Sequence, residues 1–546
     1  MQPSPDTYPN SRKQSKLMSA WIKAISACGV LRKPSTRVTT RSFRPPVESP
    51  TPVATRLFRT VQRQVGALRI LIELLFILVS WATLVRADLV YFANGGSAQL
   101  PTKVEGNTVR LETPDGLIEF QRTDFRKMVP GFWPAHEWEG RREEALAGGA
   151  EARYKAAWWA LENGLTKQAE SMLREAHAAD RAHQPTARLV SVLDQLAAPC
   201  SDPDLSSMRE SLQAKMELAR GPHVLLFHQH NEAEAAERIN LVEQVLTTYY
   251  LMLSAQGIDL PAPTQRLASF WFAQQTDYLA YLRAEHADSF LTTNGYFHPT
   301  RNVVLAYDSR SSESQRTKRA ALDVRRGELE RARKQLPARG LMRLSVGGAP
   351  ARTMNRAGAE EVLDRLNREV MRQQLLLDID WRSVDLGTAA HETVHQLTAL
   401  TSLAPDHQDF PQWLQEGYAA QFEVIRGGRW AGVGRAHDAR LPDWRKIHPP
   451  PRIVPLVRDV GFGHGYHPDL YAEAWALVYY LRKEHPAEFL TFIDLLRAPD
   501  HDLSRSERTL TAFQAAFGPE TTALESAWHR FMASLHTPLE AEDSAP

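Results

Sequence analysis

Two histidines and a glutamate within five residues form the pattern with the clearest chemistry in this sequence. The run GTAAHETVHQLTAL, residues 387–400, contains His391, Glu392 and His395 in the order H-E-x-x-H. On an α-helix the two histidines lie one turn apart on the same face, so both imidazoles can bind a single ion. Glu392 lies beside them, where it can hydrogen-bond a water molecule at the ion. The alternative is a pair of surface histidines on an ordinary helix, and a third ligand would distinguish the two.

A suitable third ligand follows in the segment DFPQWLQEGYAAQFEVIRGG, residues 409–428. Catalytic zinc requires three protein ligands and one open position. Glu416 lies on a second predicted helix, with twenty residues between it and His395. This helix is expected to run from the proline of the segment to its final Gly-Gly pair. Two helices joined by a short loop can bring Glu416 to the ion held by the histidines.

These two motifs together resemble the gluzincin zinc metallopeptidases, which include thermolysin and the zinc aminopeptidases. The segment WLQEGYA, residues 413–419, is close to the one that supplies the glutamate ligand in the aminopeptidases. The series GYFHPTRNVVLAYD, HETVHQL, PQWLQEGYAAQFE and YAEAWALVYYL is similar to an uncharacterised family of exported bacterial gluzincin-like proteins, over roughly residues 221–535. The resemblance implies Zn2+ as the cofactor, with His391, His395 and Glu416 as its ligands.

Catalytic roles follow from the same resemblance. Glu392 would take a proton from the attacking water and deliver it to the leaving amine. Tyr471 matches by context a tyrosine near the start of a later helix, which stabilises the tetrahedral intermediate in aminopeptidase-like gluzincins. Its alternative role is packing, since buried tyrosines usually pack with the hydroxyl paired. His464 and His467 are alternative groups for the oxyanion.

Two departures from the family pattern bear on the type of peptidase and on the group that orients the zinc histidines. No Gly-x-Met-x-Asn segment for a substrate's free amino terminus precedes His391, and GYFHP occupies the rough position. This difference favours an endopeptidase. Thermolysin-like members carry, four residues after the glutamate ligand, an aspartate that orients a zinc histidine, and Ala420 stands there in this sequence. The group that orients the zinc histidines is therefore left unassigned.

The elements that would position these residues predict an α+β catalytic domain over residues 221–540, with a small mixed sheet and the helices that carry both motifs. Strands are expected at 223–228, 266–273 and 302–307, and helices at 232–255, 312–340 and 355–377. The motif helix is predicted to begin just beyond Ser383, with Asp385 in its first turn. Strand 302–307 is predicted to be the sheet edge along which an extended substrate pairs.

Three further segments precede the catalytic domain. Residues 88–130 alternate apolar and polar side chains, which predicts a small β unit. Residues 131–200 predict a helical region with one tetratricopeptide-like hairpin broken near Gly164, and an ordinary amphipathic hairpin is the alternative. Its helices, within 142–196, offer a surface for a protein partner. Residues 201–220 predict a linker.

The N-terminal segment has a different composition. Residues 1–66 are rich in Pro, Ser, Thr and Arg, which predicts a disordered basic extension or a start codon placed too early. Residues 67–87 contain the apolar run Leu74–Val85 followed by small residues, which predicts an export signal cleaved before Asp88. The alternatives are an uncleaved membrane anchor and a buried core helix. The chain is therefore predicted to be exported to the periplasm or the extracellular space.

Charge and cysteine content exclude other classes. Residues 88–546 hold 61 acidic and 51 basic side chains, a formal charge of −10, which argues against nucleic-acid binding. The chain contains only Cys28 and Cys200, so removal of the leader would exclude an internal disulfide or a cysteine-based metal site.

Together these patterns predict an exported zinc peptidase that acts on peptide or protein substrates. The rival hypothesis is a non-catalytic binding module whose zinc site is structural or vestigial. Glu392 argues against the rival, because a structural site has no use for an unligated carboxylate beside the metal.

Overall fold

The computed structural model describes residues 87–114, 116–131, 134–212, 215–345, 351–401, 403, 410–462, 467–497 and 503–540. Over these residues the fold mixes α-helices with several small sheets, so the predicted α+β class is confirmed. The predictions for the basic extension at 1–66 and the export signal at 67–87 lie outside the described residues, except for Ala87. None of the described helices combines the length and apolar composition needed to cross a membrane.

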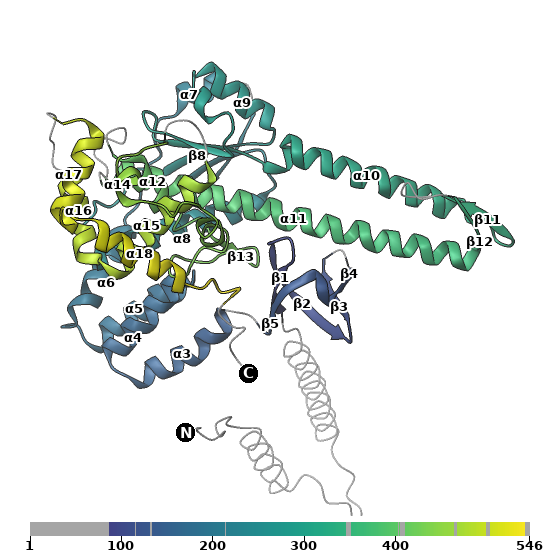
Figure 1. The fold of residues 1–546 in the computed structure, drawn as a ribbon, viewed down its shortest axis with the longest axis horizontal. Helices are drawn as coiled ribbons and strands as arrows, with labels where there is room; N and C mark the ends of the chain where they lie inside the picture. The colour runs from purple at the N-terminus through teal and green to yellow at the C-terminus, as the bar shows by residue number, and fades with distance from the viewer. Residues whose placement is uncertain are drawn as a thin grey trace, which may run out of the picture. The chain divides into compact units, whose positions relative to one another are not determined.

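A mixed sheet of strand order β6-β7-β8-β10-β9 is the framework of the C-terminal part, residues 217–540 (Figure 1). Strands β7, β8 and β10 are parallel, whereas β6 and β9 pair antiparallel with their neighbours. The strands are β6 (Glu217–Arg220), β7 (Val224–His228), β8 (Leu267–Phe272), β9 (Gly295–His298) and β10 (Val303–Tyr307). The segment 201–220, predicted as a linker, thus contains strand β6 and also helix α7 (Ser206–Ser211).

The edge of this sheet is not the strand that the sequence suggested. β10 pairs with β8 on one side and with β9 on the other, and every one of its residues is buried. The prediction that strand 302–307 forms the edge was therefore wrong. The edge beside β10 is β9, because the turn at 299–302 folds the chain back into a hairpin, and β6 is the opposite edge.

The two motifs are carried by helices that pack in one large core. Trp413, Trp475 and Trp528 are among its fully buried side chains. The helices of this part are α8 (Glu232–Ala255), α9 (Gln275–Ala284), α11 (Arg356–Leu400), α12 (Gln412–Ala419), α13 (Arg440–Trp444), α14 (Ile453–Val457), α15 (Pro468–Glu484), α16 (Pro486–Arg497), α17 (Arg505–Phe517) and α18 (Thr522–Ser534). Short 3-10 helices are η2 (Asp288–Phe290) and η3 (Ser309–Ser311), and β13 (Ile425–Arg426) pairs with β14 (Arg429–Trp430).

The motif helix α11 is a single helix of 45 residues. Its N-cap is Asn355, whose side chain accepts from the backbone N–H of Gly358. The prediction of one helix at 355–377 and another beginning beyond Ser383 was therefore wrong. Residues 378–385 contain no proline, and polar side chains there have tertiary partners that keep them inside the helix, such as Arg238 for Asp385.

The N-terminal β unit and helix α10 (Glu313–Lys334) both pack on α11, and α10 and α11 form a long helical hairpin (Figure 1). The β unit has the strand order β4-β3-β2-β1-β5, and its core also packs against apolar residues of α11. Its elements are β1 (Ala87–Phe92), β2 (Ser97–Glu105), β3 (Thr108–Thr113), β4 (Gly116–Gln121), η1 (Arg122–Asp124) and β5 (Phe125–Val129). The hairpin joins α10 to α11 through the strand pair β11 (Leu341–Leu344) and β12 (Arg352–Asn355).

Along the chain, four helices connect the β unit to the segment that begins the mixed sheet. These are α3 (Ala135–Ala147), α4 (Ala150–Glu162), α5 (Thr166–Ala179) and α6 (Gln184–Leu196). Helices α4 and α5 pack side by side around Gly164, where the sequence predicts a break. Helix α6 packs against α8, which joins this region to the C-terminal part.

A buried ion pair fixes α8 to α11 above the motif. The guanidinium of Arg238 donates to Asp385 at 2.7 Å, and both side chains are at most 3% exposed. Asp385 also accepts from the backbone N–H of Ser309 and from the indole of Trp381. The Asp385 carboxylate stabilises the packing of α8 on α11 as long as the Arg238 guanidinium balances its buried charge.

We expect Arg238→Met to lower the free energy of unfolding by about 3–5 kcal/mol, because it leaves a buried carboxylate without its cation. The control is Arg333→Met, which removes the exposed ion pair with Asp364 and is expected to cost less than about 1 kcal/mol. Urea unfolding followed by circular dichroism measures both. Equal midpoints for the two variants would contradict a stabilising role for the buried pair.

Candidate metal centre

Three side chains from two helices converge in the C-terminal part. The Nε2 atoms of His391 and His395 on α11 lie 3.1 Å apart. Glu416 on α12 places Oε2 3.1 Å from Nε2 of His391 and Oε1 3.6 Å from Nε2 of His395. One ligand atom of each residue lies within 4.8 Å of the others, and no other group of this kind is found in the described part of the chain. The structure thus brings together the three residues that the sequence singled out as ligands.

Helix α12 is held in position at its start and again near its end. The carboxylate of Asp459 accepts from the backbone N–H groups of Gln412 and Trp413, at 3.0 and 2.9 Å. A Cβ atom at Gly417 would collide with the carbonyl oxygen of Ala474, so only glycine allows α12 to pack this closely on α15. Glu416 is therefore presented by a helix fixed on both sides.

The end of α12 differs from the prediction. The helix ends at Ala419, and Gly427-Gly428 is the turn between β13 and β14, not a helix end. The early end lets the chain turn back, which brings Glu423 under the motif. Sequence reasoning missed Glu423, because it lies beyond the helix and has no fixed spacing to the ligands.

Glu423 is the group that orients the first histidine. Its Oε2 atom lies 2.8 Å from Nδ1 of His391. Because a carboxylate only accepts, Nδ1 carries the hydrogen, and Nε2 is the ring atom that faces the other ligands. Oε1 of Glu423 is held by His437 at 2.9 Å and by the guanidinium of Arg440. The partner that was left unassigned at Ala420 is therefore supplied by Glu423.

Neighbouring charges decide the ionisation of the buried groups. Burial alone would raise the pKa of Glu416, but the neighbouring His395 and His391 outweigh it and lower this pKa well below its usual value. Burial would likewise raise the pKa of Glu423, but Arg440, His391 and His437 lower it well below its usual value. Both carboxylates are therefore negative at neutral pH. Glu423 is paired with Arg440, so the negative charge of Glu416 beside the two histidines is the one that favours a cation at this point.

Glu392 lies beside the ligand cluster, on the side of the sheet edge. It accepts from the backbone N–H of Phe297 in β9, and its Cγ atom lies close to Gly295. Burial raises the pKa of Glu392, and the charges of His391 and His395 partly oppose this. The carboxylate thus stands between the histidines and the edge strand.

A cavity of about 1060 Å³ opens onto the cluster. Glu392, His391, His395 and Glu416 line it, and Tyr471 near the start of α15 lines it as well. The guanidinium of Arg440 lies 5.5 Å from the ring centre of Tyr471. Of the two alternative histidines, His467 is the N-cap of α15 and does not line the cavity, and His464 lies outside the described residues.

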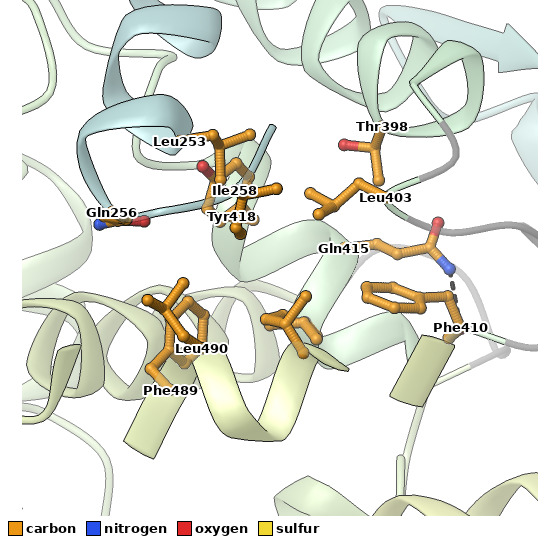
Figure 2. A pocket seen from close by; sticks show the side chains of 12 residues that line it. Leu253, Gln256, Ile258, Thr398, Leu403, Phe410, Gln415, Tyr418, Phe489 and Leu490 are labelled. Carbon is orange, nitrogen blue, oxygen red and sulfur yellow. Dashed lines mark hydrogen bonds between the residues drawn. The ribbon is translucent and has the colours of Figure 1, made fainter. Parts of the chain in front are cut away.

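A second, much smaller pocket lies behind α12, between α8, α11 and α16 (Figure 2). Its volume is about 10 Å³, and its lining includes Leu253, Leu403 and Phe489. The amide of Gln415 donates to the carbonyl oxygen of Phe410 at its margin, as Figure 2 shows. A space of this size holds at most one water molecule, so it is a packing gap and not a ligand site.

The donor set suits zinc. Two imidazole nitrogens and one carboxylate oxygen match the ligands of catalytic zinc sites that keep an open position. The match extends to the outer partner of His391, since ligating histidines usually donate their other N–H to a carboxylate.

Comparison with known proteins covers this same part of the chain. Residues 385–499 match the family described as protein of unknown function (DUF1570). The DUF1570 match begins at Asp385 and includes both motifs, Glu423 and Tyr471. No curated protein matches the chain. The match therefore covers the candidate site and assigns it no activity.

Proposed function

We propose that this chain is an exported zinc metallopeptidase with a gluzincin-like catalytic domain, and that it hydrolyses peptide bonds within polypeptides. The convergence of His391, His395 and Glu416 on one point of a large cavity carries the proposal. The position of Glu392 between this point and a sheet edge supports it further.

The residues would divide the reaction as follows. His391, His395 and Glu416 would hold the zinc, which would supply Lewis acidity and lower the pKa of water from about 15.7 towards about 7. Glu392 accepts a proton from the water as its oxygen adds to the carbonyl carbon, and it donates that proton to the amine as the C–N bond breaks. Tyr471 donates a hydrogen bond to the developing oxyanion. Glu423 keeps His391 in the tautomer that binds metal through Nε2.

The substrate would lie along β9. β9 pairs with β10 on one side only and contributes Gly295, Tyr296 and Phe297 to the cavity. An extended peptide can add to such an edge through backbone hydrogen bonds. The scissile bond would then pass beside Glu392, which is bonded to Phe297 of the same strand.

The helical region has a separate proposed role. Helices α4 and α5 form the hairpin that we take as tetratricopeptide-like, with a surface for a protein partner. This role concerns recruitment and leaves the chemistry at the metal unchanged.

The proposal is tested by measuring zinc and hydrolysis in the same samples of the full chain. We expect one zinc per chain, cleavage of casein at internal bonds, loss of cleavage on chelation, and recovery on addition of zinc. A protein that binds one zinc and cleaves neither casein nor a peptide library would favour the rival, a binding module with a structural metal.

Tyr471→Phe separates oxyanion stabilisation from packing. We expect kcat and kcat/KM to fall together, on the order of 10²-fold, with KM and zinc content nearly unchanged, because the hydroxyl acts only in the transition state. Tyr480→Phe is the control, since its hydroxyl bonds His485 on the far part of α15. An unchanged rate in Tyr471→Phe would return this residue to a packing role.

A further inference from the structure

We infer that the N-terminal β unit forms the far end of the substrate cleft, so that the preferred substrate is an extended polypeptide segment of about eight residues. The inference rests on the proposed peptidase function. It assigns the turn between β1 and β2, residues 93–96, to substrate binding at a distance from the metal.

The cleft follows one face of α11. The residues of this helix that line the cavity recur every three or four positions from Leu376 to His395, and they are Leu376, Asp380, Ser383, Val384, Gly387, Thr388, His391, Glu392 and His395. This spacing marks a single helix face. The nineteen steps from Leu376 to His395, at 1.5 Å each, make this face about 28 Å long. An extended chain rises about 3.3 Å per residue, so about eight residues span it.

The β unit is attached at the end of this face that lies away from the metal. A Cβ atom at Gly96 would lie 3.0 Å from Cγ2 of Ile379, so the turn rests directly on α11. The hydroxyl of Ser97 accepts from the backbone N–H of Gly427, which ties the same turn to the β13–β14 hairpin. These contacts fix the turn relative to the metal ligands.

The turn itself faces open space within the cavity. Tyr91, Asn94, Gly95, Gly96 and Ser97 all line the cavity, and Asn94 and Gly95 are exposed. Gly95 has a φ of 98°, and no atom lies within 4 Å of where its Cβ would be. A bulky side chain at this turn would therefore enter the cleft.

Among the described residues, the end of the cavity away from the metal is lined by polar and apolar side chains and by no positively charged ones. The arginines that line the cavity are Arg440 and Arg505, and both belong to the metal end, where they pair with Glu423 and Asp459. The carboxylate of Asp380 accepts from the side chain of Gln315. Binding at the far end should thus use hydrogen bonds and apolar contact, and it should depend little on salt.

The test compares two quenched fluorescent peptides that share one cleavage site found in casein, with four and ten residues. Binding energy from remote residues raises kcat/KM, so we expect the full-length wild type to prefer the longer peptide by about tenfold or more. Asn94→Trp, which fills the far end, should reduce this ratio towards one. Asn107→Trp places the same side chain on the exposed β2–β3 turn outside the cavity, and it should keep the wild-type ratio.

The ratio cancels any general loss of folded enzyme. A ratio near one in the wild type, or the wild-type ratio in Asn94→Trp, would overturn the inference while peptide cleavage itself upheld the proposed function. If the zinc-loaded wild type cleaves neither peptide nor casein, the proposed function fails, and the inference fails with it.

Discussion

Glu392→Gln is expected to keep its zinc and to lose turnover by about 10²–10⁴-fold, the range that general acid–base assistance typically contributes. The carboxylate faces the sheet edge through its bond with Phe297 and is not one of the three convergent ligands. Glutamine has the same shape and can still accept from Phe297, but it cannot take up a proton. The geometry of the site should therefore persist while the proton transfer is lost.

Steady-state kinetics on a cleaved peptide, with zinc measured in the same preparation, checks this expectation. Glu361→Gln is the matched control, because it makes the same change on an exposed position of α11 far from the cavity. It should leave kcat/KM and zinc content at wild-type values. An unchanged rate in Glu392→Gln would remove the proposed mechanism.

Glu416→Ala is expected to lose most of its zinc affinity. Glu416 is the carboxylate ligand of the cluster, so its removal takes away both a ligand and a partly buried negative charge. The loss should exceed the roughly 10–100-fold that removal of an outer-shell partner costs. Helix α12 should survive, because Asp459 and the Gly417 contact with α15 hold it independently of the metal.

Competition with a chromophoric chelator measures this loss, and circular dichroism reports whether the helices remain. Glu423→Gln gives the comparison on the same side of the site: it retains an acceptor for His391 and should fall within the 10–100-fold range. Wild-type affinity in Glu416→Ala would show that the third ligand is another group. Equal losses in both variants would place Glu423 closer to the metal than proposed.

The local part of the site was open to sequence reasoning, because helical spacing is a local property. His391 and His395 share a face through the period of the helix, and Glu416 shares a compact unit with them because the connection is short. Glu423, His437 and Asp459 were not predictable in this way. They reach the site through turns beyond α12 whose geometry depends on packing against α15, which no spacing in the sequence encodes.

The two errors in the fold have the same origin. Ser383 and Asp385 are residue types typical of a helix start, but α11 continues through both, and the side chain of Asp385 pairs with Arg238 of α8. The apolar strand at 302–307 was taken for an edge, yet such runs are typical of strands covered on both faces. The edge strand beside it, residues 295–298, has only four residues, which is too short for an alternating pattern to predict a strand there.

The continuity of α11 limits how this protein can change length during evolution. One added residue between Ile379 and His391 would rotate the contact of the β unit by about 100° around the helix relative to the metal ligands. Insertions and deletions in this stretch should therefore be purged by selection. Beyond the β unit, towards β12, an added turn in α11 matched by one in α10 changes only the reach of the hairpin, so length variation among homologues is expected to accumulate there.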